Sequence, residues 1–376
     1  MIEQIVMLTK EYPTAHDPIY PFVQQLARGF ADAGVHVTVI APLSLTRVIR
    51  YRKQMPDRYV RESEHLTIKR PFTISLSSFA PRLNAFLFRH AAQRALPKWV
   101  DVIYGHFVAP SGLAAAQLGE RLGRFSFLGY GESSPKRYAS YKKEYLRRGL
   151  RALGGVIAVS SENAREVRDQ QILPDDVRMC VAPNAIDPAL FHPMDRAQAR
   201  ENLNMPQDAF IVAFVGGFNE RKGVMRLSQA LDRMEGVQSI FIGQGEQTPS
   251  CHGILYQGTV AHEQIPQYLA AADAFVLPTL AEGCCNAIVE ALSMGLPVIS
   301  SNLPFNDDIL HDGNAIRIDP NSVDQIEQAI LALKNDPALR ARLAQNARQT
   351  ARELDISSRV QKILSFMEDA AIEEDT

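Results

Sequence analysis

Cysteine and long apolar runs are both scarce in this sequence. Its 376 residues include four cysteines, whose spacing matches neither a zinc site nor a thiol redox motif. We expect Cys180, Cys251, Cys284 and Cys285 to be reduced residues of the core or of loops. No apolar run reaches the roughly 18 residues of a membrane span, and the start from Met1 to Leu8 lacks the basic flank of a signal peptide. A cytoplasmic protein is therefore expected.

Two ligand motifs are also missing. The first predicted strand is not followed by Gly-x-Gly-x-x-Gly, which disfavours an NAD-dependent oxidoreductase. No Asp-x-Asp sequence stands at a predicted strand end, so we expect no bound metal. We expect no other cofactor, and the chain has no internal repeat.

The length suits two domains of about 150 to 200 residues, each with its own core. Short apolar runs alternate with helical patterns, from Ile5–Leu8 to Ala315–Ile318, which predicts an α/β protein with parallel sheets covered on both faces. The pattern is interrupted between Pro183 and Pro193. The sequence therefore predicts two Rossmann-like domains, residues 1–187 and 188–355, and an amphipathic C-terminal helix over residues 356–376.

Charge is distributed unevenly between the two halves. Through Asp187 there are 26 Lys and Arg against 17 Asp and Glu, whereas the remainder has 14 against 25. Basic residues gather between Arg47 and Arg61, between Arg82 and Lys98, and between Lys136 and Arg148. Nucleic acid, an anionic membrane surface or ordinary solvated helix faces would each account for this charge pattern by itself. We expect no nucleic-acid partner.

Glu282 and Glu290 are the most informative pair of residues. They lie between the apolar runs Ala274–Pro278 and Pro297–Ser300, so the pattern is strand, loop, helix, strand. If the helix begins near Asn286, Glu282 lies in the loop and Glu290 lies one turn along the helix. Loops at the carboxyl edge of a parallel sheet are the usual place for a ligand crevice. Carboxylates accept hydrogen bonds from sugar hydroxyls and a helix N-terminus favours phosphate, so the pattern indicates a nucleotide sugar.

This pattern resembles the Glu-x7-Glu signature of retaining GT-B glycosyltransferases, in particular family four. Pro183–Asp187 resembles the inter-domain segment of the family, and Val215–Phe218 with Arg221-Lys222-Gly223 resembles its phosphate-binding loop. Gly243-Gln244-Gly245 also fits. The resemblance implies two Rossmann-like domains facing across a cleft, the first binding the acceptor and the second the donor, with the C-terminal helix returning to the first domain.

The resemblance also implies roles for individual residues. Glu282 would bind hydroxyls of the transferred sugar, Glu290 the ribose, and Arg221 and Lys222 the departing diphosphate. Gly217 stands where the family usually has arginine, so Arg221 is expected to substitute for it. The candidates for catalysis are Glu282, Lys222, Arg221 and His106; those for donor binding are Gly216, Gly217, Gly243, Gly283, Cys284, Cys285, Asn286 and Glu290; those for the acceptor side are His16, Tyr20, Tyr130 and Glu132.

The function expected from this resemblance is a retaining, metal-independent hexosyltransferase. It would move a hexose or N-acetylhexosamine from a UDP-sugar or GDP-sugar to a lipid-linked or growing surface glycan. The basic first domain would then dock on the inner face of the cell membrane. A nucleotide-sugar epimerase of the same architecture and a non-catalytic nucleotide-sugar-binding protein are the alternatives, and product analysis would separate the three.

Overall fold

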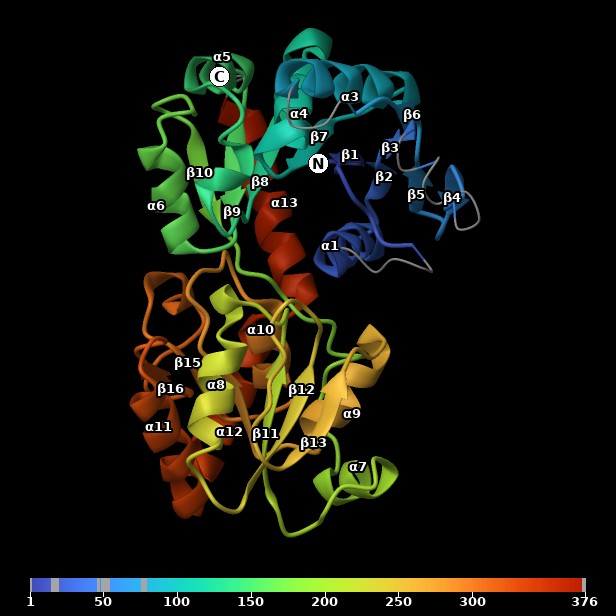
Figure 1. Cartoon of the computed structure of the whole chain (residues 1–376). Coiled ribbons are helices and arrows are strands. Elements are labelled where there is room, and N and C mark those ends of the chain that lie inside the picture. The colour runs from blue at the N-terminus through green and yellow to red at the C-terminus, as the bar shows by residue number, and fades with distance from the viewer. Residues whose placement is uncertain (1, 15–19, 46–47, 49–54, 76–79, 374–376) are drawn as a thin grey trace. The chain divides into compact units, whose positions relative to one another are not determined.

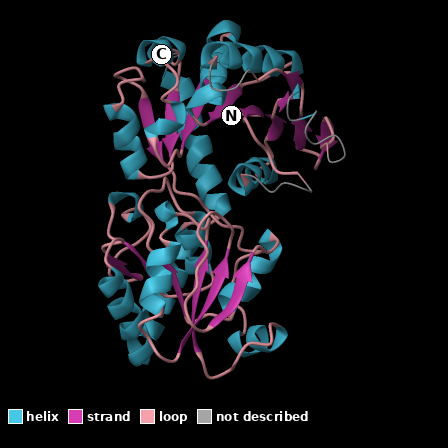
Figure 2. Ribbon diagram, in the orientation of Figure 1, coloured by secondary structure: helices cyan, strands magenta, loops and turns pink. Residues whose placement is uncertain are grey.

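The computed structural model describes residues 2–14, 20–45, 48, 55–75 and 80–373. The chain folds as two compact units, Met1–Pro183 with Ile356–Thr376, and Asn184–Asp355 (Figure 1). Each unit is an α/β domain built on a mainly parallel sheet (Figure 2). The prediction of two Rossmann-like domains is confirmed.

The first unit contains an eight-stranded sheet in the order β10-β9-β8-β7-β1-β2-β5-β4. Its central strands are entirely buried because helices cover them, and they read as continuous apolar runs. The strands of the unit are β1 (Gln4–Leu8), β2 (His36–Ile40), β3 (Leu43–Ser44), β4 (Tyr59–Arg61), β5 (Leu66–Lys69), β6 (Phe72–Thr73), β7 (Val102–His106), β8 (Phe125–Tyr130), β9 (Gly155–Ala158) and β10 (Arg178–Val181). Its α-helices are α1 (Pro21–Asp32), α3 (Pro81–Ala95), α4 (Leu113–Leu122), α5 (Lys143–Gly149), α6 (Ser161–Asp169) and α13 (Ile356–Glu373).

The expectation of a wholly parallel first sheet is wrong at one edge. β4 pairs antiparallel with β5, and β3 and β6 form a separate two-stranded parallel sheet. These four strands are short, and neither β4 nor β6 is buried, so the region between residues 43 and 73 lacks the apolar runs that marked the other strands. Hydrophobic patterning identifies buried strands better than exposed ones.

Helix α13 packs against α1, β9 and β10 of the first unit, as the family resemblance implied for the C-terminal helix. The two helices approach closely at Gly29. A Cβ atom at this position would lie 2.8 Å from Cγ2 of Val360 and 2.9 Å from Cγ1 of Ile356. Gly29 therefore permits the contact that attaches the end of the chain to the first domain.

The second unit contains a six-stranded sheet in the order β13-β12-β11-β14-β15-β16, and all its pairs are parallel. The strands are β11 (Phe210–Val215), β12 (Val237–Ile242), β13 (Ile254–Gly258), β14 (Ala274–Leu277), β15 (Val298–Ser301) and β16 (Ala315–Ile318). The α-helices are α7 (Arg196–Asn202), α8 (Val224–Leu231), α9 (Ile265–Ala270), α10 (Asn286–Ser293), α11 (Val323–Asn335) and α12 (Pro337–Glu353). Short 3-10 turns η3 (Glu220–Lys222), η4 (His262–Gln264) and η5 (Pro304–Asn306) follow three of the strands.

The order of strands in the second unit decides where its loops meet. β11 lies between β12 and β14, so the loops after these strands share one edge of the sheet. The segments Gly216–Gly223, Gly243–Gly245 and Thr279–Cys285 all leave from this carboxyl edge. The predicted donor-binding residues are therefore brought together by the fold.

No helix in the described part of the chain is long and apolar enough to span a membrane. The four cysteines are buried and form no disulfide with one another in the described structure.

Candidate active site

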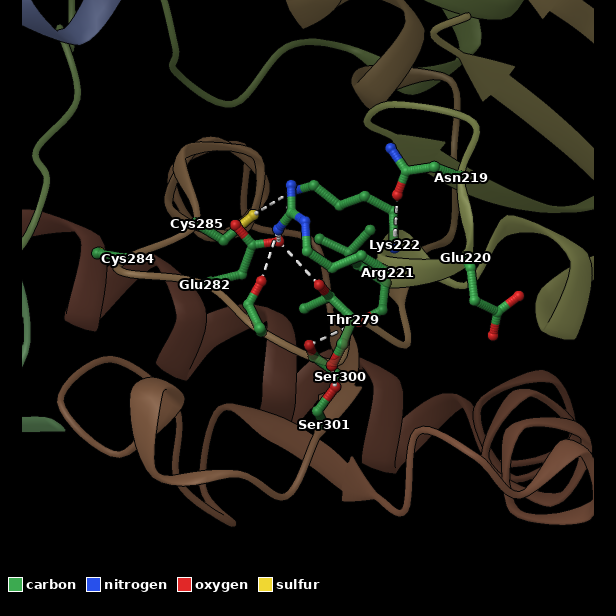
Figure 3. Close-up of polar contacts among 12 residues, drawn as sticks. Asn219, Glu220, Arg221, Lys222, Thr279, Glu282, Cys284, Cys285, Ser300 and Ser301 are labelled. Carbon is green, nitrogen blue, oxygen red and sulfur yellow. Dashed lines mark hydrogen bonds and ion pairs between the residues drawn. The ribbon is translucent and has the colours of Figure 1, made fainter. Parts of the chain in front are cut away.

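Glu282 is the centre of a compact polar cluster in the second unit. Its Oε1 lies 2.6 Å from Nη1 of Arg221 and 2.7 Å from Nζ of Lys222. The hydroxyl of Thr279 donates to the same oxygen at 2.8 Å (Figure 3). The cluster holds two cations and one carboxylate, so it retains a net positive charge that suits an anionic ligand.

The loop between β11 and α8 is built so that Arg221 and Lys222 reach Glu282. Asn219 caps the turn, because its Oδ1 accepts a hydrogen bond from the backbone N–H of Lys222 at 3.1 Å. Gly223 ends the turn with φ of 76°, and a Cβ atom there would lie 2.4 Å from the carbonyl oxygen of Pro278. Only glycine permits this close approach of the two loops without strain.

Lys222 is well shielded from solvent, with 13% of its side chain exposed. Burial alone would lower its pKa, but the nearby Cys285 sulfur and the Glu282 carboxylate more than offset this effect and raise the pKa above its ordinary value. Lys222 therefore stays a cation at neutral pH. Lys222 is thus buried and paired, unlike a lysine at a solvated helix start.

Glu290 lies on α10, which begins at Asn286 as predicted. The residue is 8% exposed, and its Oε1 is 3.1 Å from Nε2 of His262. The hydrogen bond to Glu290 raises the pKa of His262 above its ordinary value. The His262 ring also packs against Phe191, with 5.3 Å between ring centroids. A buried carboxylate needs such a partner, and the sequence indicated the need without identifying the partner.

Asn184 ties the start of the second unit to the loop before α10. Its side-chain amide donates to the carbonyl oxygen of Cys284 at 3.0 Å and to Oδ1 of Asn286 at 2.7 Å. Its backbone N–H lies 3.3 Å from Sγ of Cys284. The Sγ atom of Cys285 is 3.6 Å from Nζ of Lys222. Cys285 therefore borders the Glu282 cluster, whereas Cys284 contacts Asn184, and Gly283 lies in the same loop.

The glycines after β11 and β12 allow these loops to touch. A Cβ atom at Gly243 would lie 1.9 Å from the carbonyl oxygen of Gly216, at a φ of 150°. Gly217 follows, and a Cβ atom there would meet Nδ2 of Asn219 at 2.8 Å. The predicted residues Gly216, Gly217 and Gly243 therefore lie together beside the turn that carries Lys222.

His106, a predicted catalytic residue of the first unit, has mainly aromatic surroundings. His106 ends β7 and is 5% exposed, and burial lowers its pKa to about 3. Its Nδ1 is 3.3 Å from the Tyr104 hydroxyl, whereas Nε2 has no hydrogen-bond partner among the described residues. The rings of Phe22 and Phe107 pack against this histidine, and Tyr20 packs on Phe107. His106 is thus a neutral imidazole at neutral pH.

Two predicted acceptor-side residues, Tyr130 and Glu132, lie at the end of β8 and are buried. Tyr130 is fully buried, and its hydroxyl donates to Oε2 of Glu166 at 2.9 Å. Glu132 is 5% exposed and accepts hydrogen bonds from the backbone N–H groups of Val108 and Gly131. Both side chains are engaged within the domain: Tyr130 is the last residue of β8, and Glu132 lies two residues beyond it. His16 lies outside the described residues.

Sequence reasoning missed three contributors to the second-unit site: Thr279, His262 and Asn219. Each lies just after a strand at the carboxyl edge of the sheet, at β14, β13 and β11 respectively. Their place after strands at this edge was the signal by which the sequence could have indicated them as site residues. Their contacts depend on the fold, because Thr279 and Glu282 meet across a loop and His262 reaches Glu290 from a different strand.

Two family models match the chain. Residues 22–190 match "Glycosyltransferase Family 4", and residues 195–350 match "Glycosyl transferases group 1". The chain is 25% identical over 373 residues to a Bacillus subtilis protein named for teichuronic acid biosynthesis, the glycosyltransferase TuaC, covering 92% of this chain and 93% of the relative. It is 26% identical to an Escherichia coli UDP-Gal:alpha-D-GlcNAc-diphosphoundecaprenol alpha-1,3-galactosyltransferase, covering 55% of this chain and 58% of that one.

Solved structures share the fold. Sucrose-phosphate synthase from Thermosynechococcus elongatus has a TM-score of 0.82 at 19% identity, covering 99% of this chain and all of the other. Anabaena HepE, solved in complex with UDP-glucose, has a TM-score of 0.72 at 19% identity, covering 97% of this chain and 99% of that one. Taken with the sheet topology and the family models, these similarities identify the chain as a glycosyltransferase of the GT-B fold.

Proposed function

We propose that this glycosyltransferase moves a hexose or N-acetylhexosamine from a UDP-sugar or GDP-sugar to a lipid-linked or growing surface glycan. The observation that carries the proposal is the pair of acidic sites in the second unit: Glu282 held by Arg221 and Lys222, and Glu290 held by His262. The names of the relatives support the acceptor class, because they refer to teichuronic acid and to a diphosphoundecaprenol-linked sugar.

Glu290 is the candidate for the ribose of the donor. Its carboxylate is buried on a helix, and its side chain keeps 11% exposure, so one edge is accessible. A carboxylate accepts hydrogen bonds from neighbouring hydroxyls. With Oε1 held by His262, we expect Oε2 to accept a ribose hydroxyl.

Arg221 and Lys222 are the candidates for the diphosphate. Both carry charge within 3 Å of Glu282, and Lys222 is buried enough for its charge to act strongly on a developing anion. Because two cations are available to balance the leaving diphosphate, we propose a reaction that does not require a divalent metal. Glu282 would meanwhile accept hydrogen bonds from hydroxyls of the transferred sugar.

The proposed reaction retains the configuration at the anomeric carbon. The bond between that carbon and the diphosphate oxygen breaks, and the acceptor oxygen forms a new bond on the same face. The acceptor proton passes to the departing phosphate oxygen, so the products are the glycoside and a nucleoside diphosphate. Lys222 and Arg221 would lower the barrier by stabilising the charge on the leaving group.

The first unit is proposed to bind the acceptor. His106 and Tyr20 are the candidates there, because Nε2 of His106 has no hydrogen-bond partner among the described residues. A neutral imidazole can donate or accept one hydrogen bond to an acceptor hydroxyl.

Product analysis tests this proposal. The purified protein is screened for thermal stabilisation by UDP, GDP and their sugars, since a ligand that binds the native state raises its stability. The stabilising donor is then incubated with undecaprenyl-diphosphate-linked acceptors, and the anomeric configuration of the product is determined by NMR. Transfer with retention supports the proposal, inversion refutes the retaining reaction, and an epimerised or unchanged donor sugar refutes transferase activity on those acceptors.

A further inference from the structure

We infer that the exposed face of α3, with the turn after it, docks the first unit onto an anionic membrane surface. The face consists of Arg82, Leu83, Phe86, Arg94, Lys98 and Trp99, called the α3 face below. This inference extends the proposed function, because a lipid-linked acceptor is presented at such a surface. Its test uses neither donor nor acceptor, so its failure would leave the transfer reaction standing.

The sequence around α3 contains no acidic residue. Residues 65–100 include six Lys and Arg and no Asp or Glu, although acidic residues are as common as basic ones in the whole chain. Two of the six are turned inward or partly covered, since Arg70 is 5% exposed and Lys69 donates to the carbonyl oxygen of Ala95. Arg82, Arg94 and Lys98 are exposed. These three cations have no carboxylate nearby in sequence that would neutralise them.

The exposed positions of α3 form one line along the helix. Arg82, Phe86, His90 and Arg94 follow one another at intervals of four residues, and all are exposed. Residues at this spacing lie on the same face of a helix. The opposite face, with Ala85, Phe88, Ala91 and Ala92, is buried in the domain. Arg82, at one end of this line, lies 5.0 Å from the centroid of the Tyr145 ring on α5, and all four positions remain exposed to solvent.

Apolar side chains stand on this line, where solvated helices usually carry polar ones. Phe86 is 50% exposed and Leu83 is 44% exposed. The Phe86 ring stacks on His90, and the Arg89 guanidinium lies 5.4 Å from its centroid. Trp99, four residues beyond the end of α3, is 43% exposed and is the only tryptophan of the chain.

The apolar surface continues onto the neighbouring strand. β6 packs against α3 (Figure 1). Phe72 in this strand is 40% exposed, and Ile74 just after it is 46% exposed. The Arg58 guanidinium lies 4.3 Å from the centroid of the Phe72 ring. Cations beside exposed aromatic and aliphatic side chains therefore recur on two adjacent elements.

Charge and apolarity together favour a lipid surface as the occupant. Helices that lie in a membrane interface combine Lys and Arg with Trp, Phe and Leu, so that the cations meet headgroups and the apolar groups enter the acyl boundary. Tryptophan is enriched at that depth. A partner that was only charged would gain nothing from Leu83, Phe86 and Trp99.

The direct test is sedimentation of the full chain with vesicles. Vesicles of phosphatidylcholine with phosphatidylglycerol are compared with phosphatidylcholine alone, at low and high salt. We expect binding to the anionic vesicles, weakened by salt, because the Debye length falls from about 30 Å at 0.01 M to about 8 Å at 0.15 M. Trp99 emission should shift to shorter wavelength on binding, and no other tryptophan contributes to that signal.

Variants distinguish the α3 face from the rest of the surface. The double variant Arg82→Gln/Arg94→Gln should weaken partitioning about fivefold per charge removed. Phe86→Ser should weaken it about tenfold through lost apolar burial. Met194→Ser, at a position 45% exposed in the second unit, and Arg342→Gln/Arg352→Gln on α12 of the same unit are matched controls that should bind as wild type.

Three results would overturn the inference. The first is that the wild type shows no preference for anionic vesicles at low salt. The second is that the control variants lose as much vesicle binding as the α3-face variants. The third is that the wild type self-associates without lipid and that Phe86→Ser abolishes this self-association. The last would show that the face binds a second copy of the chain. All substituted positions are exposed, so thermal unfolding curves should remain close to wild type and verify that the variants are folded.

Discussion

Replacing Glu290 by alanine should weaken binding of the nucleoside diphosphate. The structure gives the carboxylate one partner, His262, at 3.1 Å, and the proposal assigns its other oxygen to a ribose hydroxyl. A hydrogen bond to a charged group is worth about 1.5–3 kcal/mol. Since 1.4 kcal/mol corresponds to a tenfold change, Kd should rise roughly 10- to 150-fold.

His262→Ala should have a smaller effect through the same carboxylate. This substitution removes the imidazole that holds Oε1 of Glu290, but it leaves in place Oε2 of Glu290, the oxygen proposed to bind the ribose. Loss of an ordinary hydrogen bond costs about 0.5–1.5 kcal/mol, so Kd should rise roughly 2- to 12-fold. The double variant should show non-additivity, because the two residues are in contact.

Isothermal titration calorimetry with UDP or GDP, whichever binds, measures these constants. The 2′,3′-dideoxy form of the same nucleotide provides the decisive comparison. Wild type should bind the dideoxy form more weakly by about the factor lost in Glu290→Ala, and that variant should no longer distinguish the two ligands. Glu263→Gln is the matched control, since Glu263 is exposed beside His262. Wild-type affinity in Glu290→Ala, or unchanged discrimination, would refute the ribose assignment.

Three further predictions follow from the second unit. Lys222→Ala should lower kcat about a hundredfold, with partial recovery in Lys222→Arg, whereas EDTA should have little effect in the same assay; a loss in EDTA that magnesium restores would contradict the metal-independent proposal. Asp273→Ala should destabilise the protein by about 3–5 kcal/mol in urea unfolding, because Arg200, 3% exposed, would lose its partner at 2.7 Å; a loss under 1 kcal/mol would contradict this. The pKa of His262 is raised, so its contribution to stability is present below its ordinary pKa of 6.5 and is lost as pH rises through the raised value; the difference in unfolding temperature between wild type and His262→Asn should therefore shrink from about pH 6 to about pH 9.

The alternation of apolar runs with helical patterns was sufficient to predict the framework of both domains. β14 lies within the expected run Ala274–Pro278, β16 occupies Ala315–Ile318, and α10 begins at Asn286, where a helix start was assumed. Buried strands and amphipathic helices leave this record because each must present apolar side chains to a core. The short strands β4 and β6 are not buried and show no such hydrophobic pattern, so the antiparallel edge of the first sheet was not predicted.

Residue types and their order also indicated the chemistry of the donor site. Glu282, Glu290, Arg221 and Lys222 were identified from the sequence, since a carboxylate within an apolar helix needs partners and the motifs resemble those of a known family. Their pairing was not identified. Arg221 and Lys222 meet Glu282 some sixty residues away, and His262 meets Glu290 from a different strand.

Only the tertiary structure decided these partners, because strand order places β11 between β12 and β14 and so brings separate loops to one edge. Tertiary structure also decided burial at single positions. Tyr130 and Glu132 were predicted on the acceptor side, and only the structure shows that both are buried and bonded within the domain. The α3 face shows the reverse, since Phe86 resembles a core residue and is half exposed. Sequence pattern records which residue types are present and at what period, whereas the packing of distant elements determines which side chains reach solvent and which reach each other.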